Sequence, residues 1–161
     1  MIERLLPHAP PMRMLTALHT HDAHGLQCSA TFDASCPFAD ADGVIDPMVC
    51  IELVAQAAAL WTALQQAHGA GPPRHGVIAS CRQARFAPVT LNVGDTVAIH
   101  VTRVAGDDTF ASFDGTVSHV EIPARSEPAA KRGARVRFCT RANHAEVATI
   151  SLGVVIDGAP Q

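Results

Sequence analysis

The most apolar stretch of the chain runs from residue 47 to residue 68 and carries helix signals at both ends. Asp46 is a good N-cap, Pro47 suits the first helical position, and the Gly- and Pro-rich segment after His68 stops the helix. About 22 residues would form a rod of roughly 33 Å. Apolar side chains occupy nearly its whole circumference, which a surface helix would not tolerate. The pattern therefore predicts a long central helix wrapped by other elements.

Most of the remaining chain alternates apolar and polar residues with the period of two that is typical of half-buried strands. Segments 13–20 and 26–32 flank His24-Gly25 and are predicted to form a hairpin, and the acidic segment 33–46 is predicted to be a loop. Further strands are expected at 76–86, 97–101, 111–117, 136–138 and 148–156. These elements favour an α+β architecture in which a curled antiparallel sheet wraps the long helix.

Length and composition indicate one globular domain spanning residues 1–161. Of the 161 residues, 48% are apolar and 17% are charged, which is enough to bury a core. The segment 118–135 interrupts the strand pattern with two prolines, a glycine and mixed charges, so we expect a loop excursion there.

Charge and cysteine usage exclude several classes of protein. A net charge of -3 without a dense basic stripe excludes nucleic acid as a partner. The N-terminus lacks the apolar run of a signal peptide, and polar residues break the longest apolar stretch, so no membrane span is expected and the protein is predicted to be cytoplasmic. Five cysteines without a C-x-x-C pair indicate reduced thiols, with neither a disulfide framework nor a zinc site.

Two polar side chains interrupt the apolar helix. Glu52 precedes Gln56 by one turn, so both lie on the same helix face. A carboxylate there is costly unless another group satisfies it or a reaction uses it. The sequence leaves two interpretations open, a functional site or a structural hydrogen bond from Glu52 to a strand or a dimer mate.

Three stretches carry a family resemblance. Residues 5–12 read LLPHAPPM, residues 51–58 read IELVAQAA, and residues 84–89 read ARFAPV and are followed by Gly94-Asp95. In this order they resemble the opening L-L-P-H-x-x-P-M/F, the helix motif I-E-x-x-A-Q-A-A and the strand and turn R-F-x-x-P-V-x-P-G-D of bacterial 3-hydroxyacyl-ACP dehydratases, the hotdog-fold family of fatty acid and polyketide synthesis. A closer likeness is to the divergent dehydratase-like proteins of aryl-polyene pigment clusters.

The resemblance implies a hotdog fold and a dimer, formed either by two identical chains or with another hotdog dehydratase. The substrate would be an acyl chain on the phosphopantetheine of an acyl carrier protein, with no cofactor or metal. The family's carboxylate maps onto Glu52, which there helps to expel the β-hydroxyl as water. The N–H groups of Met48 and Val49 would stabilise enolate charge at the thioester carbonyl. Gln56 and Arg85 complete the predicted substrate-binding residues.

The chain departs from the family at the catalytic histidine. Family members read G-H-F-P, whereas position 38 is phenylalanine here, and a loop two residues longer makes Cys36 the equivalent residue. The usual P-G at the helix start is Asp46-Pro47, and Pro47 has no N–H to donate. Because a thiol is mostly protonated at pH 7, Cys36 is either a weak replacement for the base or a small packing residue.

The other histidines offer alternatives. His19, His21 and His24 form H-x-H-x-x-H near the predicted turn, but Asp22 is the one further ligand nearby, so solvated turn residues are favoured over a metal site. His75 precedes the strand that lines the acyl tunnel in the family and is kept as a reserve base.

Two features have no assigned chemistry. His8 lies in the opening motif and is interpreted as a capping or packing residue. Arg82 and Arg85, together with the basic residues of segment 131–137, would either face an acidic carrier protein or form a solvated charged surface.

The sequence therefore predicts a 3-hydroxyacyl-ACP dehydratase-like protein that acts on carrier-bound acyl thioesters in fatty acid or polyene synthesis. One alternative is a non-catalytic subunit that completes a heterodimer with an active dehydratase, which the loss of the histidine would explain. Another is an acyl thioesterase, because hotdog thioesterases use a single helix carboxylate to activate water and need no histidine.

Overall fold

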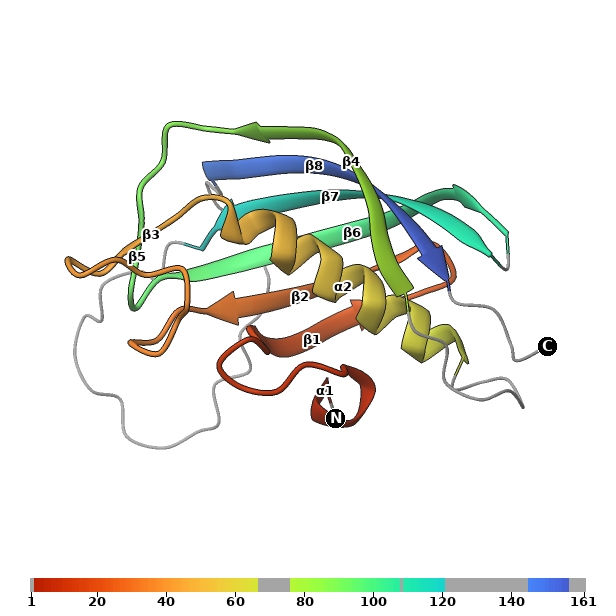
Figure 1. Ribbon diagram of the computed structural model, residues 1–161, viewed down its shortest axis with the longest axis horizontal. Coiled ribbons are helices and arrows are strands. Elements are labelled where there is room, and N and C mark those ends of the chain that lie inside the picture. The colour runs from red at the N-terminus through yellow and green to blue at the C-terminus, as the bar shows by residue number, and fades with distance from the viewer. Residues whose placement is uncertain (1, 67–75, 108, 121–144, 157–161) are drawn as a thin grey trace, which may run out of the picture.

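The computed structural model describes residues 2–66, 76–107, 109–120 and 145–156. One long helix, α2 (Val49–Gln66), packs against one face of a six-stranded antiparallel sheet whose strand order is β1-β2-β6-β7-β8-β4 (Figure 1). The strands of this sheet are β1 (Leu15–His21), β2 (Gly25–Thr31), β4 (Gly76–Phe86), β6 (Thr96–Gly106), β7 (Phe110–His119) and β8 (Ala145–Ile156). The predicted combination of one central helix and a curled antiparallel sheet is confirmed.

Three short elements complete the described fold. The helix α1 (Ile2–Leu5) lies at the N-terminus, and β3 (Val44–Ile45) pairs with β5 (Leu91–Asn92) beside the start of α2 (Figure 1). Segment 33–46, predicted as a loop, is irregular except for β3. The predicted strand at 136–138 and most of the predicted excursion at 118–135 lie outside the described residues, while β7 extends to His119.

The helix α2 begins two residues later than the sequence predicts. Asp46 is the cap, as expected, because its Oδ1 atom accepts a hydrogen bond of 2.8 Å from the Met48 N–H. Val49 and Cys50 donate to carbonyls three residues earlier, so one tighter turn precedes the regular helix. The helix continues to Gln66, and its predicted end at His68 lies outside the described residues.

Most of the circumference of α2 is buried, as its sequence requires, and the remaining residues are partly buried. No residue of the helix is exposed, and Leu53, Val54 and Leu60 are completely buried. The sheet approaches the helix closely at Gly115 of β7, where an added Cβ atom would lie 2.5 Å and 2.6 Å from the two methyl groups of Val54. The helix therefore packs on the sheet with no room for a side chain at this crossing. None of the described helices is long and apolar enough to cross a membrane.

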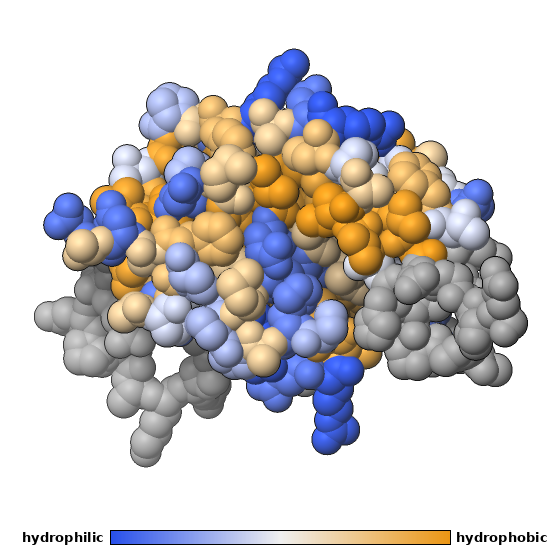
Figure 2. Space-filling view, in the orientation of Figure 1, coloured by the Kyte–Doolittle hydropathy of each residue, from blue (hydrophilic) through white to orange (hydrophobic). Residues whose placement is uncertain are grey.

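The edge strand β4 is exposed along its whole length. Every residue of β4 is exposed, including apolar ones: Val77 at 66%, Ile78 at 41% and Phe86 at 37%. An edge strand also presents unpaired backbone N–H and C=O groups. The face that β4 crosses carries broad apolar areas on both sides of a hydrophilic patch (Figure 2). This surface has the character of an interface that a second chain would cover.

The crossing of α2 and β7 generates a test of the packing. We expect Gly115→Ala to lower the free energy of unfolding by about 1–3 kcal/mol, because the new methyl group overlaps the branched side chain of Val54. Val54→Ala should cost stability by itself but should remove most of the clash in the double variant. Urea unfolding of the four proteins measures this coupling. Strictly additive losses would contradict the close approach.

Candidate active site

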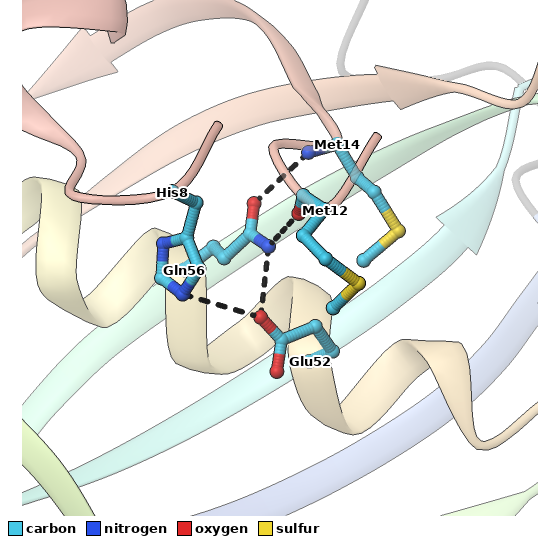
Figure 3. Close-up of polar contacts among 5 residues, drawn as sticks. All are labelled: His8, Met12, Met14, Glu52 and Gln56. Atoms are coloured by element: carbon cyan, nitrogen blue, oxygen red, sulfur yellow. Dashed lines mark hydrogen bonds and ion pairs between the residues drawn. The ribbon is translucent and has the colours of Figure 1, made fainter. Parts of the chain in front are cut away.

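The carboxylate of Glu52 lies one turn into α2 and is held at a single oxygen. Its Oε1 atom accepts a hydrogen bond of 2.8 Å from Nε2 of Gln56, and Nε2 of His8 lies 3.6 Å from the same oxygen (Figure 3). The Oε2 atom points away from this cluster and takes no hydrogen bond from the described residues. The side chain is 24% exposed. Glu52 is thus anchored at Oε1, and its side chain as a whole is only partly buried.

Gln56 joins the helix to the N-terminal segment. Its side chain is completely buried. The Oε1 atom accepts a hydrogen bond of 3.1 Å from the Met14 N–H, and the Nε2 atom donates a hydrogen bond of 2.6 Å to the Met12 carbonyl (Figure 3). These bonds connect residues more than forty positions apart in the sequence. The two motifs of residues 5–12 and 51–58 therefore meet in space. Every polar atom of the Gln56 amide is used by the protein itself.

His8 is the site residue for which the sequence offered no role. Its ring is 33% exposed, with Nε2 facing Glu52, while its Nδ1 atom is buried and has no hydrogen-bond partner among the described residues. Leu6, which is buried in the core, anchors the segment that carries it. The available signal was that His8 and Glu52 both belong to motifs of the resemblance. Their separation in the sequence hid the contact.

Cys36 lies in the loop before β3, half-buried and packed against the edge of the core. Its backbone takes part in two turn hydrogen bonds, to the Asp33 carbonyl and from the Ala39 N–H. Within the described part of the chain, no hydrogen bond or ion pair joins Cys36 to Glu52. This placement agrees with a packing residue. Among the described residues, no contact supports a role for Cys36 as the catalytic base.

The N–H groups expected to receive a thioester carbonyl are already used inside the chain. The Met48 N–H donates to the Asp46 carboxylate, and the Val49 N–H donates 3.0 Å to the Asp46 carbonyl. Val49 is completely buried, whereas the Met48 side chain is 50% exposed. In this conformation neither N–H is free to stabilise an enolate.

The remaining candidates lie apart from Glu52 or outside the described residues. Arg85 lies on the exposed strand β4 and forms no ion pair with the described residues. His19 bonds to Ser29 at 3.0 Å, and no group of three His, Cys, Asp or Glu side chains among the described residues is placed to hold a metal. His75 and the basic segment 131–137 lie outside the described residues.

Buried thiols contribute packing and no nucleophile. Burial raises the pKa of Cys28 and the pKa of Cys50 to about 12, so both thiols are protonated at neutral pH. Cys50 is two residues from Glu52 on the same helix and is completely buried. Neither of these two thiols is therefore a nucleophile at neutral pH.

The anchoring role of Gln56 can be measured directly. We expect Gln56→Met to reduce stability by about 2–3 kcal/mol, because a thioether of similar length leaves the buried Met14 N–H and Met12 carbonyl unpaired. Gln65→Met is the matched control, since that amide makes one exposed bond, to the Asp22 carbonyl. Thermal and urea unfolding report both losses. Equal losses for the two variants would contradict the anchoring role.

Solved structures similar to this chain share its whole fold. The dehydratase heterocomplex ApeI:P from Xenorhabdus doucetiae matches with a TM-score of 0.77 at 20% identity, over 98% of this chain and 91% of that chain. A hypothetical thioesterase with coenzyme A from Streptococcus pneumoniae TIGR4 matches with a TM-score of 0.60 at 10% identity, over 90% and 88% of the two chains. The PaaI protein of Escherichia coli matches with a TM-score of 0.57 at 12% identity, over 86% of this chain and 80% of that chain. The predicted hotdog fold is confirmed.

Comparison with curated proteins gives no match. A family model described as ApeP-like, ApeP dehydratase, matches residues 1–134. The matched region contains the opening segment with His8 and the helix with Glu52 and Gln56, which the structure brings together. It covers most of the sequence, and the chain therefore belongs to the ApeP-like dehydratase family.

Proposed function

We propose that this chain is a subunit of a dehydratase that removes water from 3-hydroxyacyl chains carried on an acyl carrier protein, in the synthesis of aryl polyenes or related lipids. The observation that carries the proposal is the Glu52 carboxylate, which is partly exposed, is held at Oε1 by Gln56 and takes no hydrogen bond at Oε2 from the described residues. Membership of the ApeP-like dehydratase family supports the reaction class.

Dehydration breaks the C2–H and C3–O bonds of the substrate and forms a C2=C3 double bond. A base takes the C2 proton, and an acid gives a proton to the hydroxyl, which leaves as water. We assign the acid to Glu52, whose Oε2 atom is free of protein partners within the described residues. Gln56 positions this carboxylate in place of the substrate contact expected from the sequence, and Cys36 serves as a packing residue.

We assign the C2 base to a second hotdog chain that pairs along β4. The exposed apolar residues and free backbone of that strand are suited to continuing the sheet into a partner. The ApeI:P heterocomplex is a precedent for a dehydratase with two different chains. The acyl carrier would dock beside the interface, where Arg85 offers a positive charge to an acidic surface.

Glu52→Gln tests the assignment of the acid. In a mixture of this chain with the hotdog dehydratase encoded nearby, we expect the variant to lower the rate of water loss from 3-hydroxyacyl-ACP by about 100-fold or more, because a carboxamide is too weak an acid to protonate the leaving hydroxyl. Glu146→Gln, at an exposed position of β8, removes the same charge and should keep full activity. Mass spectrometry of the acyl chain follows the reaction.

The same assay separates the alternatives. Unchanged activity of the Glu52→Gln mixture would show that this chain is a non-catalytic subunit. Release of free acid from the thioester, lost in the Glu52→Gln variant, would assign a thioesterase instead.

Ile78→Asp tests the interface along β4. We expect it to weaken association roughly 30-fold or more, because an apolar side chain buried between chains contributes about 2 kcal/mol. Val104→Asp is the matched control, because Val104 is an apolar residue of β6 that is 57% exposed and away from that edge. Sedimentation of each variant, alone and with the partner, measures the strength of association. Equal association of wild type and Ile78→Asp would exclude this edge.

A further inference from the structure

Two side-chain nitrogens converge on one oxygen of Glu52. Gln56 Nε2 donates to Oε1 at 2.8 Å, and His8 Nε2 faces the same atom at 3.6 Å (Figure 3). An oxygen that accepts from two donors is a poor place for the proton of a carboxylic acid, because a hydrogen on that oxygen would point at other hydrogens. The exchangeable proton of Glu52 would then reside on Oε2, which points away from the cluster.

The surroundings of His8 indicate which ring nitrogen carries its hydrogen. A hydrogen on Nδ1 would be a buried donor without an acceptor among the described residues, whereas a hydrogen on Nε2 points at the Glu52 carboxylate. With the hydrogen on Nε2, the buried Nδ1 is an acceptor without a donor. This costs less free energy than a buried Nδ1–H without an acceptor, because Nε2–H then gains a charge-assisted contact with the carboxylate. The structure therefore favours the tautomer in which Nε2 bears the hydrogen.

We propose that His8 is a positioning residue for Glu52: its Nε2–H fixes Oε1 as an acceptor and leaves Oε2 as the atom that carries the exchangeable proton. The contact is longer than a direct hydrogen bond, and contacts of this kind tighten when a substrate binds. Gln56 holds the segment that carries His8 in place through its hydrogen bonds to Met12 and Met14. The same Gln56 side chain therefore fixes the position of both nitrogens that face Glu52. This role rests on the proposed dehydratase function.

His8→Gln and His8→Ala separate positioning from packing. The glutamine amide reaches from the same backbone position to donate an N–H to Oε1, so we expect its kcat to stay within about threefold of wild type. His8→Ala should lower kcat by at least about tenfold with KM within twofold, and added imidazole should recover part of that loss. His100→Gln, at an exposed position of β6, is the control and should behave as wild type.

The assay uses the mixture of this chain with its dehydratase partner, and thermal unfolding confirms that each variant is folded. Wild-type kcat in His8→Ala would overturn the proposal. Equal losses in the alanine and glutamine variants would also overturn it, because an N–H donor would then not be sufficient.

A second measurement does not depend on activity. Nitrogen-15 NMR of labelled histidine in the full chain, assigned by comparison with His8→Gln, reports the tautomer of the ring. We expect the hydrogen on Nε2. A hydrogen on Nδ1 would overturn the positioning role even if the dehydratase assay succeeds. An Nε2 hydrogen together with an inactive mixture would instead remove the proposed function and leave the contact between His8 and Glu52 in place.

Discussion

The buried amide of Gln56 is the interaction on which the site depends. A side chain from the central helix satisfies a backbone N–H and a backbone carbonyl of the opening segment, and it also donates to Glu52. The bond to the Met14 N–H is buried and the bonds to the Met12 carbonyl and Glu52 are partly buried, so leaving them unmade is costly and the four groups are held in one arrangement. The position of Glu52 therefore follows from the packing of the N-terminus on α2, and the same packing carries His8 to its place.

The central helix and the edge strand β4 differ sharply in how far they are buried. The sheet and the N-terminal segment leave no residue of α2 exposed, whereas every residue of β4 is exposed at the opposite edge of the sheet from β1. Burial of the helix gives the single chain its core. The apolar edge strand has the composition of a surface that pairs with another strand. The proposed site shared by two chains is consistent with this division, because a partner paired along that edge would bring its own groups to it.

The start of α2 satisfies its own N–H groups with Asp46. Pro47 has no N–H, and Asp46 takes up the next two N–H groups with its side chain and its carbonyl. The helix N-terminus is thereby satisfied by the protein, which stabilises the helix and removes donors that would otherwise face a ligand. Polar chemistry in the described site is concentrated instead on the outward side of Glu52.

Local patterns were sufficient for the elements and for the motif residues. The apolar circumference of residues 47–68, the Asp46 cap and the alternation of the strands predicted a wrapped helix and an antiparallel sheet, because burial and capping depend on neighbours in the sequence. The spacing of Glu52 and Gln56 predicted a shared helix face for the same reason. The resemblance of three short stretches then indicated the family.

Tertiary structure alone decided which groups those residues contact. Whether Gln56 faces a substrate or the protein depends on Met12 and Met14, whose backbone groups carry no sequence signal. The contact of His8 with Glu52 joins segments that only the packing of the N-terminus brings together, and Cys36 lies in a loop whose path no periodicity describes. Sequence patterns report local geometry and burial, whereas the partners of a buried polar group are set by which distant segments the fold packs against it.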